Sequence, residues 1–439
     1  MEIKKFILLS ITVLLGGLAL TACSGSDSTD GEIVPPTNEL ADDSNGKKVS
    51  GDSMVVDMLP ETRAIKLTEE QKQIARKIND FTFNLYRAVW QTEKKSNITS
   101  PMSVAYIIGM LNDGASGKTA QEMMQVLGLG NDGKTDINEF CKALISQAPQ
   151  ADPSVILQIA NLVAANKDII LSDAYRQDMH NFYDAEVTSL DFSQPKSLDY
   201  LNGWCNEKSN GMIPTIIDRL SPNDLMVLMN AVYFKAPWTN RFDTKDTKSE
   251  SFTKGDGNSA TIPMMYRRAE ILYSNNDIYS SIRLPFGSGD IWSMYVILPA
   301  EGKTIDEVVN SFTNLSWDKQ KAAGKTIVDI KLPRFSTTSD ILLNDIIASL
   351  GAPTMFISDK AEFTGISKDQ EMYINLIKQK AAIEVSEEGT KTSAVTVARS
   401  VGANGSVKTA EFHANRPFVY IIQEMNTNAI FFIGTYMGD

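Results

Sequence analysis

Histidine is the side chain that most often serves as a general base, and this chain of 439 residues has only two, His180 and His413. A serine hydrolase needs a histidine base with an orienting partner, and a zinc site needs clustered histidine or cysteine ligands. Neither histidine has such neighbours in the sequence. The sequence therefore argues against an enzyme and against a metal centre, and we expect no cofactor.

The cysteine content and the net charge exclude further classes of function. Cys141 and Cys205 could form a disulfide, but their spacing suggests neither a disulfide framework nor a metal motif, so two free, buried thiols are expected. The formal net charge is −12, and the chain has no basic run. Such a protein is a poor partner for nucleic acid.

Residues 384–418 instead indicate a segment that can change its conformation. They follow a strand-like run at 373–386 and precede an apolar block at 418–436, where a loop is expected. Side chains alternate across a strand with a period of two. On one face of this segment every side chain is small: Thr390, Thr392, Ala394, Thr396 and Ala398. A loop that is written like a strand suggests function by conformational change rather than by catalysis.

The surrounding elements change in character along the chain. A capping box at 68–71 predicts a first helix to about Trp90, and Ser100-Pro101 predicts a second that ends near 112–114. Further helices are expected at 119–128 after a second capping box, 136–146, 197–209 and 340–350, the last with Gly351 as its stop. Strands are expected at 155–164, 226–234, 251–253, 270–273, 279–285, 292–298, 326–333, 418–423 and 429–435. Helices first and strands later predict an α+β fold with large sheets.

The amino-terminal residues read as a secretion signal. Residues 1–22 have a basic end and an apolar run, and their ending Leu-Thr-Ala before Cys23 resembles a bacterial lipobox. That resemblance implies a lipidated Cys23 that anchors the protein to a membrane; an ordinary signal peptide with a chance cysteine is the alternative. Residues 23–66 are polar and read as a flexible tether. Residues 67–439 are long enough for one large domain or two.

An ordered series of motifs resembles the serpin family from about Leu67 to Met437. The matching segments are 97–103, 111–119, 202–213, 230–235 with Trp238 and Phe242, 350–351, 363–365 and the Glu-Glu-Gly-Thr of 387–390. One motif could arise by chance, but the ordered set is specific. The resemblance implies a single serpin domain at 67–439, with helices, three β-sheets, a large central sheet and an exposed reactive-centre loop at about 387–411.

The resemblance also implies a mechanism, which is suicide inhibition of serine proteases, with cysteine proteases as a second class. The target cleaves the loop and forms an acyl-enzyme, and the cut loop then inserts as a strand into the main sheet. The product is a covalent complex with the protease. A non-inhibitory serpin that serves as a surface binding or carrier protein is the alternative. We expect a monomer in the cell envelope, at the outer membrane or facing the outside.

The hinge of the loop corresponds to Glu387, Glu388, Gly389, Thr390, Thr392 and Ala394. Gly389 permits the bend where insertion starts, and the small side chains that follow favour inhibition over the alternative. Inhibitors usually have alanine where this chain has Thr392 and Ser393; Ala394 keeps the family pattern. A buried threonine hydroxyl needs a partner, so Thr392 could slow insertion.

The bait bond is placed by two counts. The family usually has the residue before the scissile bond fourteen positions after the hinge glycine, and this count and one back from Pro417 both give Ala403. Ala403–Asn404, flanked by Val401 and Gly402, suits the small apolar pocket of an elastase- or subtilisin-like protease. Arg399 could serve a trypsin-like protease only if cleavage came four residues early.

Four residues match a polar cluster beneath the main sheet of the family. Ser100, Ser103 and Asn230 occupy its usual positions, and Gln379 replaces the usual histidine. An amide can donate and accept hydrogen bonds, so the network can survive, but it has no titrating member.

A second set of residues matches the top of that sheet. Arg334 and Glu387 occupy positions that form a salt bridge in relatives, and Trp238 lies near the same opening. As a partly exposed pair, the salt bridge is expected to contribute about 1 kcal/mol or less.

Overall fold

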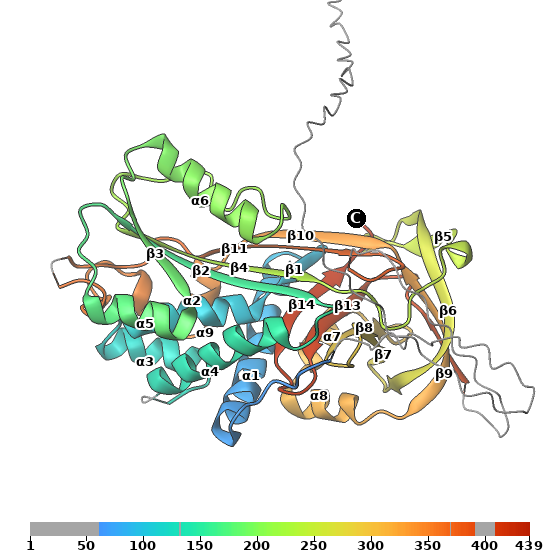
Figure 1. Ribbon diagram of the computed structural model, residues 1–439. Coiled ribbons are helices and arrows are strands. Elements are labelled where there is room, and N and C mark those ends of the chain that lie inside the picture. The colour runs from blue at the N-terminus through green and yellow to red at the C-terminus, as the bar shows by residue number, and fades with distance from the viewer. Residues whose placement is uncertain (1–60, 131–132, 369, 391–408) are drawn as a thin grey trace, which may run out of the picture. The chain divides into compact units, whose positions relative to one another are not determined.

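The structure is a computed structural model that describes residues 61–130, 133–368, 370–390 and 409–439. All of these residues belong to one compact unit, residues 57–439 (Figure 1). Both cysteines in this unit are free and buried, as expected. Within the described ranges, no helix is long and apolar enough to cross a membrane.

The described ranges contain nine α-helices. Their bounds are α1 (Glu69–Thr92), α2 (Pro101–Asp113), α3 (Gly117–Val126), α4 (Gly133–Gln147), α5 (Asp173–Tyr183), α6 (Pro195–Lys208), α7 (Ile305–Ser311), α8 (Asn314–Lys321) and α9 (Asn344–Leu350). The first two start where predicted: the Thr68 hydroxyl and the Gln71 side chain form the capping box of α1, and Ser100 caps α2. Gly351 ends α9 with a φ of 124°, as expected of a stop signal.

Fourteen strands in the same ranges form three sheets. They are β1 (Asn97–Thr99), β2 (Ile156–Asn166), β3 (Ala185–Leu190), β4 (Met226–Lys235), β5 (Lys248–Thr253), β6 (Ser259–Asn275), β7 (Tyr279–Phe286), β8 (Trp292–Pro299), β9 (Lys325–Pro333), β10 (Phe335–Leu342), β11 (Lys378–Val385), β12 (Thr409–His413), β13 (Phe418–Glu424) and β14 (Ile430–Tyr436). The largest sheet has the order β1-β14-β13-β8-β7-β6-β9-β12, with β5 added to β6. The other two are β3-β2-β4 and the pair β10-β11. The α+β class with three sheets is confirmed.

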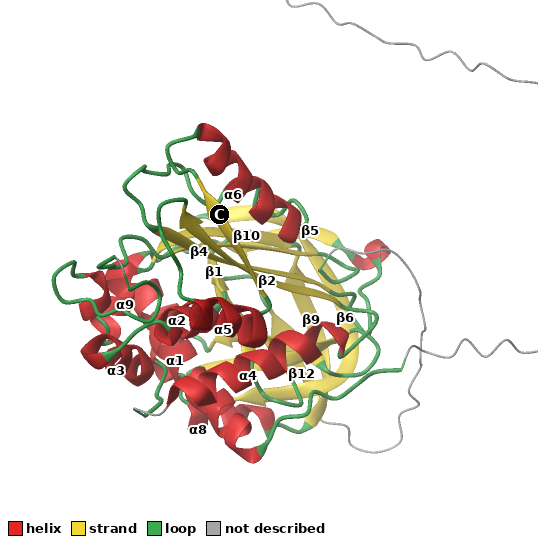
Figure 2. Ribbon diagram, turned by 60° about the vertical axis from the view of Figure 1, so that its left-hand side comes forward, coloured by secondary structure: helices red, strands yellow, loops and turns green. Residues whose placement is uncertain are grey.

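The helices lie on two sides of the smaller sheets. Helix α6 covers one face of β2, β3 and β4, while α2, α4 and α5 lie on the other side (Figures 1 and 2). Leu201, Trp204 and Cys205 of α6 pack in one buried cluster with Met229 and Ala231 of β4. Odd-numbered residues of β4 therefore face α6, and even-numbered residues face the main core.

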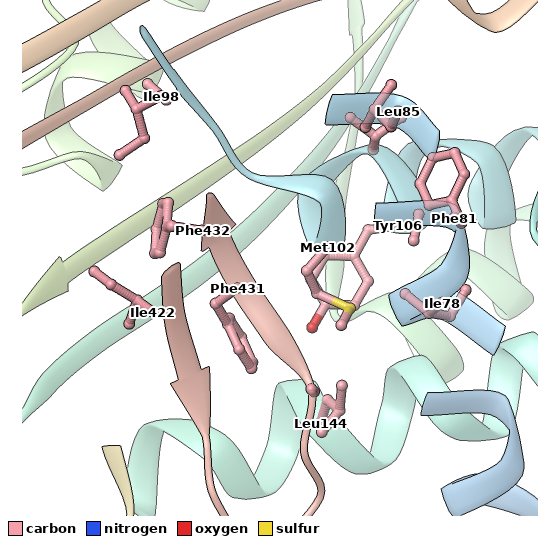
Figure 3. Packing of buried hydrophobic residues seen from close by; sticks show 14 of the residues in the cluster. Ile78, Phe81, Leu85, Ile98, Met102, Tyr106, Leu144, Ile422, Phe431 and Phe432 are labelled. Atoms are coloured by element: carbon pink, nitrogen blue, oxygen red, sulfur yellow. The ribbon is translucent and has the colours of Figure 1, made fainter. Parts of the chain in front are cut away.

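The main core lies between the first helices and the carboxyl-terminal strands (Figure 3). Apolar residues at helical spacing on α1, such as Ile78, Phe81 and Leu85, meet Met102 of α2 in this cluster. Strands β13 and β14 contribute Ile422, Phe431 and Phe432 to the same cluster. Segments at opposite ends of the chain thus share one core.

Two helix boundaries were predicted wrongly. Residues 340–342 belong to strand β10, because Asp340 to Leu342 pair with Lys378 to Lys380 of β11, and the helix begins only at Asn344. The second capping box does not start a helix. Helix α3 already begins at Gly117, and the Thr119 hydroxyl accepts a hydrogen bond from the backbone N–H of Glu362 instead.

Candidate functional site: the hinge and the slot beside it

Strand β11 ends in a tight turn that reverses the chain at residues 386–389. The backbone groups of Ser386 and Gly389 form hydrogen bonds with each other at 2.9 and 3.1 Å. Gly389 has a φ of 124°, and a Cβ there would collide with the Ala236 carbonyl and the Trp238 backbone nitrogen. Only glycine fits this position, because other residues rarely adopt this positive φ and because their Cβ would collide with the neighbouring backbone. The bend predicted at Gly389 is thus present.

Thr390 pairs with Ala236, which directly follows β4. Its N–H donates to the Ala236 carbonyl at 2.7 Å, and the Ala236 N–H donates to the Thr390 carbonyl at 3.1 Å. This reciprocal exchange defines a hydrogen-bonded pair of an antiparallel ladder. Thr390 is buried, and its hydroxyl lies 3.2 Å from the Ala236 carbonyl oxygen. The chain after β11 has therefore turned back and begun to run along β4.

Below this turn lies a slot, which we define as the space between the facing edges of β4 and β11. These two strands belong to separate sheets and exchange no backbone hydrogen bond within the described residues. At the far end of the slot a cleft of about 780 Å³ opens, lined by Met226 to Met229 of β4 and by Leu376 and Lys378 near the start of β11. Two unpaired strand edges are a template for an added strand.

The Glu387 carboxylate is held at the top of the slot. Its Oε2 accepts a hydrogen bond from Arg334 Nε at 2.8 Å, and its Oε1 accepts from Arg334 Nη2 and from the Thr247 hydroxyl, both at 2.6 Å. The Glu387 side chain is 4% exposed and that of Arg334 is 47% exposed. The pair is partly exposed, as expected, through Arg334, whereas the Glu387 carboxylate itself is buried.

The electrostatics of Glu387 follow from this geometry. Burial alone would raise its pKa, but the hydrogen bonds from Arg334 and Thr247 outweigh burial, so that the pKa of Glu387 is lowered. The carboxylate is thus charged at neutral pH, and its bidentate pair with a guanidinium is of the stronger kind.

Trp238 is placed against the same turn. Its indole Nε1 donates to the Ser386 carbonyl at 2.9 Å, and its backbone N–H donates to the Glu388 carbonyl at 2.8 Å. The indole stacks on Phe286 with ring centroids 4.3 Å apart. The prediction that Trp238 lies near the opening is thus met by direct contact with the hinge.

Three of the four residues that were predicted to form a polar cluster lie together in the structure. The Gln379 amide accepts from the Ser100 N–H at 3.1 Å and donates to the Ser100 carbonyl at 2.7 Å, and the Ser103 hydroxyl donates to that of Ser100 at 2.9 Å. Asn230 bonds to none of these. Its Nδ2 donates to Asn161 at 2.8 Å, while its buried Oδ1 has no partner among the described residues.

Replacing Gln379 with alanine is expected to destabilise the native chain. The substitution leaves the buried N–H of Ser100 without a partner, and it leaves the Ser100 carbonyl with only the Val104 N–H at 3.4 Å, which together cost roughly 2 kcal/mol. The urea unfolding midpoint measures the effect. Gln158→Ala is the matched control, because Gln158 is an exposed glutamine in β2. Equal midpoints for the two variants would contradict a structural role for Gln379.

Several predicted residues lie outside the described ranges. They are the lipidation residue Cys23, the hinge residues Thr392 and Ala394, and the bait residues Arg399, Val401, Gly402, Ala403 and Asn404. Other contacts of the site had no signal in the sequence. Thr247 and Ala236 bond the hinge from segments that are about 140 to 150 residues away, and only the fold brings them there.

Residues 128–135 match the Gly-x-x-x-x-Gly-Lys-Thr pattern of phosphate-binding loops. That loop requires a strand before it and a helix after it. Here a helix, α3, precedes the motif, and the Lys134 ammonium contacts the Asp113 carbonyl at 2.7 Å and the Asp113 carboxylate at 3.1 Å. Both observations argue against nucleotide binding.

Comparison with known proteins identifies the family of this fold. The model of the family "Serpin (serine protease inhibitor)" matches residues 76–438. An uncharacterized serpin-like protein of Thermococcus kodakarensis is 32% identical over 410 residues, which cover 90% of this chain and 92% of that protein. Human neuroserpin is 29% identical over 378 residues, with 82% of this chain and 90% of neuroserpin covered.

Solved structures show the same likeness. The thermophilic serpin tengpin in its native state superposes with a TM-score of 0.77 at 27% identity, covering 86% of this chain and 96% of tengpin. Native protease nexin-1 with heparin superposes with a TM-score of 0.73 at 26% identity, covering 84% of this chain and all of that chain. The chain belongs to the serpin family, whose members are generally protease inhibitors.

Proposed function

We propose that this chain is a suicide inhibitor of serine proteases that traps its target by inserting the cleaved loop into the slot. The pairing of Thr390 with Ala236 carries the proposal, because it supplies the first rung of a new ladder beside two strand edges that have no partner among the described residues. Insertion then extends an existing hairpin, so that no new strand has to be nucleated.

The register of insertion follows from this first rung. In an antiparallel ladder each step down one strand is a step up the other. Continuing the ladder pairs Thr392 with Phe234, Ala394 with Val232, and Thr396 with Asn230. Because residues directly opposite each other point to the same face, the inserted side chains point toward the core with Phe234.

The core under the slot accounts for the small inward face of the loop. Phe234 already packs against Phe286, Trp292 and Phe432, with ring centroids 5.3–6.3 Å apart. A bulky neighbour would overpack this aromatic group. In the same register Thr396 meets Asn230, and its hydroxyl can donate to the Oδ1 that lacks a partner.

The bait bond completes the proposal. Cleavage at Ala403–Asn404 by an elastase- or subtilisin-like protease leaves the loop up to Ala403 attached to β11 and free to insert. Cysteine proteases of similar preference form a second target class. The inhibitor acts as a monomer, since one chain supplies both the loop and the slot.

An elastase-like protease mixed with the chain tests this function on a denaturing gel. The expected result is an SDS-resistant complex together with a released peptide whose mass corresponds to residues 404–439. Cleavage without any complex, across several proteases of different specificity, would instead support a non-inhibitory serpin. A complex with a peptide of different mass would keep the function and move the bait bond.

We also propose that the chain is a lipoprotein, anchored through Cys23 in the cell envelope. The lipobox-like ending before Cys23 supports this, together with the polar residues that separate it from the folded unit. Cys23→Ser is expected to abolish incorporation of labelled fatty acid and to move the protein from the membrane fraction to the soluble fraction. Unchanged labelling would show that Cys23 is not the lipidated residue.

A further inference from the structure

Arg267 of β6 is a half-buried cation without a carboxylate partner among the described residues. Its Nε is buried and has no hydrogen-bond partner in that part of the chain, while its Nη1 donates to the Asn240 carbonyl. Its guanidinium carbon lies 5.0 Å from the centroid of the Phe242 ring. Burial lowers the pKa of Arg267 to about 10, so the side chain is still charged at neutral pH.

Such an arrangement is costly for stability alone. Even partial burial of a charge without a carboxylate partner costs desolvation free energy, which an apolar side chain of similar volume would not lose. Arg267 instead uses its flat guanidinium in two ways, as a donor to one carbonyl and as a cation over one ring. Both partners belong to the segment that follows β4.

This segment, residues 236–242, is the part of the chain that holds the hinge. Ala236 pairs with Thr390, the Trp238 N–H donates to the Glu388 carbonyl at 2.8 Å, and the Phe242 N–H donates to the Glu387 carbonyl at 3.0 Å. The segment follows the end of β4 and is not part of a regular strand. It bonds to the hinge mainly through its backbone. Its first half is also bonded to the end of β7, where the Thr239 N–H donates to the Pro285 carbonyl at 2.9 Å and the Gly287 N–H donates to the Pro237 carbonyl at 2.8 Å. Arg267 of β6 contacts the second half of the segment, at Asn240 and Phe242.

We propose that Arg267 is a positioning residue for loop insertion, which fixes Asn240 and Phe242 and thereby presents the N–H groups of residues 236–242 to the hinge. This role rests on the proposed function, because it matters only if insertion starts from the hinge. For this role Arg267 needs no contact with a protease. It acts through the segment that forms the first rung of the ladder.

Hydrogen exchange of the intact, uncleaved chain tests the positioning without any protease. Arg267→Gln is expected to raise the exchange rates of the Trp238, Phe242 and Thr390 amides by about tenfold, as for loss of a partly buried cation–π contact. Amides of β13 and β14 are expected to keep their rates. Arg268→Gln is the matched control, because Arg268 is the next residue of β6 and is exposed. Unchanged rates in Arg267→Gln, or the same rise in both variants, would overturn the proposal.

Arg267→Lys separates positioning from charge. Lysine keeps the positive charge but lacks the flat fork that stacks on an aromatic ring and bonds a carbonyl. The expected result is a rise in exchange close to that of Arg267→Gln. Full protection in the lysine variant would show that charge alone suffices and would overturn the positioning role.

The same variants in the protease assay separate this inference from the function on which it rests. If insertion starts at the hinge, Arg267→Gln is expected to lower the ratio of trapped complex to cleaved inhibitor by about tenfold. Faster exchange with unchanged trapping would leave Arg267 as the support of the hinge but refute insertion from it. Unchanged exchange with altered trapping would refute the role given to Arg267.

Discussion

Replacing Thr390 with arginine is expected to abolish protease trapping and to turn the chain into a cleavable substrate. Thr390 is buried and forms the first rung beside Ala236. An arginine there either carries an unpaired charge into the sheet, at a cost of several kcal/mol, or keeps the hinge out of the slot. In both cases deacylation outruns insertion, and the protease is released active.

A denaturing gel and the residual protease activity measure this result. The yield of SDS-resistant complex is expected to fall by more than about tenfold, as for the burial of an unpaired charge, while the rate of loop cleavage stays close to that of the parent chain. Thr244→Arg is the control, because Thr244 is an exposed threonine near the same end of the molecule. Trapping by Thr390→Arg at the parent level would refute insertion that starts at this residue.

Replacing Glu387 with glutamine is expected to weaken the top of the slot. Glutamine keeps the shape of the side chain but offers the Arg334 guanidinium only one neutral oxygen. The Thr247 hydroxyl keeps an acceptor. Losing a charge-assisted bidentate contact on a buried carboxylate lowers the stability of the native chain by about 2 kcal/mol. The urea unfolding midpoint measures the loss.

The loss in Glu387→Gln depends on pH in a defined direction. Because the pKa of Glu387 is lowered in the folded chain, its contribution is fully present above the unfolded value of about 4.3 and disappears as the pH falls through the folded value. The parent chain and Glu387→Gln should therefore differ most at neutral pH and converge in acid. Glu388→Gln, the neighbouring change without a described ion pair, is expected to follow the parent chain at every pH. A constant difference across the range would show that Glu387 contributes by packing and not by charge.

Local signals in the sequence predicted the elements that depend on nearest neighbours. The capping box of α1, the Ser-Pro start of α2 and the glycine that ends α9 act within one helical turn, so they can be read without knowing the fold. The two wrongly predicted helix starts have the opposite cause. Residues 340–342 pair with β11, and Thr119 bonds to Glu362, and such partners are far away in the chain.

The same division holds within the candidate site. The bend at Gly389 could be predicted, because glycine is the residue that readily adopts the backbone conformation of such a bend. The hydrogen bonds to the buried Glu387 carboxylate could not be predicted, because they depend on how the turn packs against Thr247 and Arg334. Nor could the separation of Asn230 from the Ser100 cluster, which follows from its place opposite Asn161 in the ladder of β2 and β4.

The sequence by itself determined the fold class, the family and the alternation of small residues after Gly389, because periodicity and motif order are properties of the chain. The tertiary structure alone decided that Thr390 is already paired with Ala236, that β4 and β11 exchange no hydrogen bond within the described residues, and that Arg267 contacts the segment that follows β4. These features depend on contacts between residues that are far apart in sequence. Such contacts form only when strands and loops are brought together, and no local pattern records them.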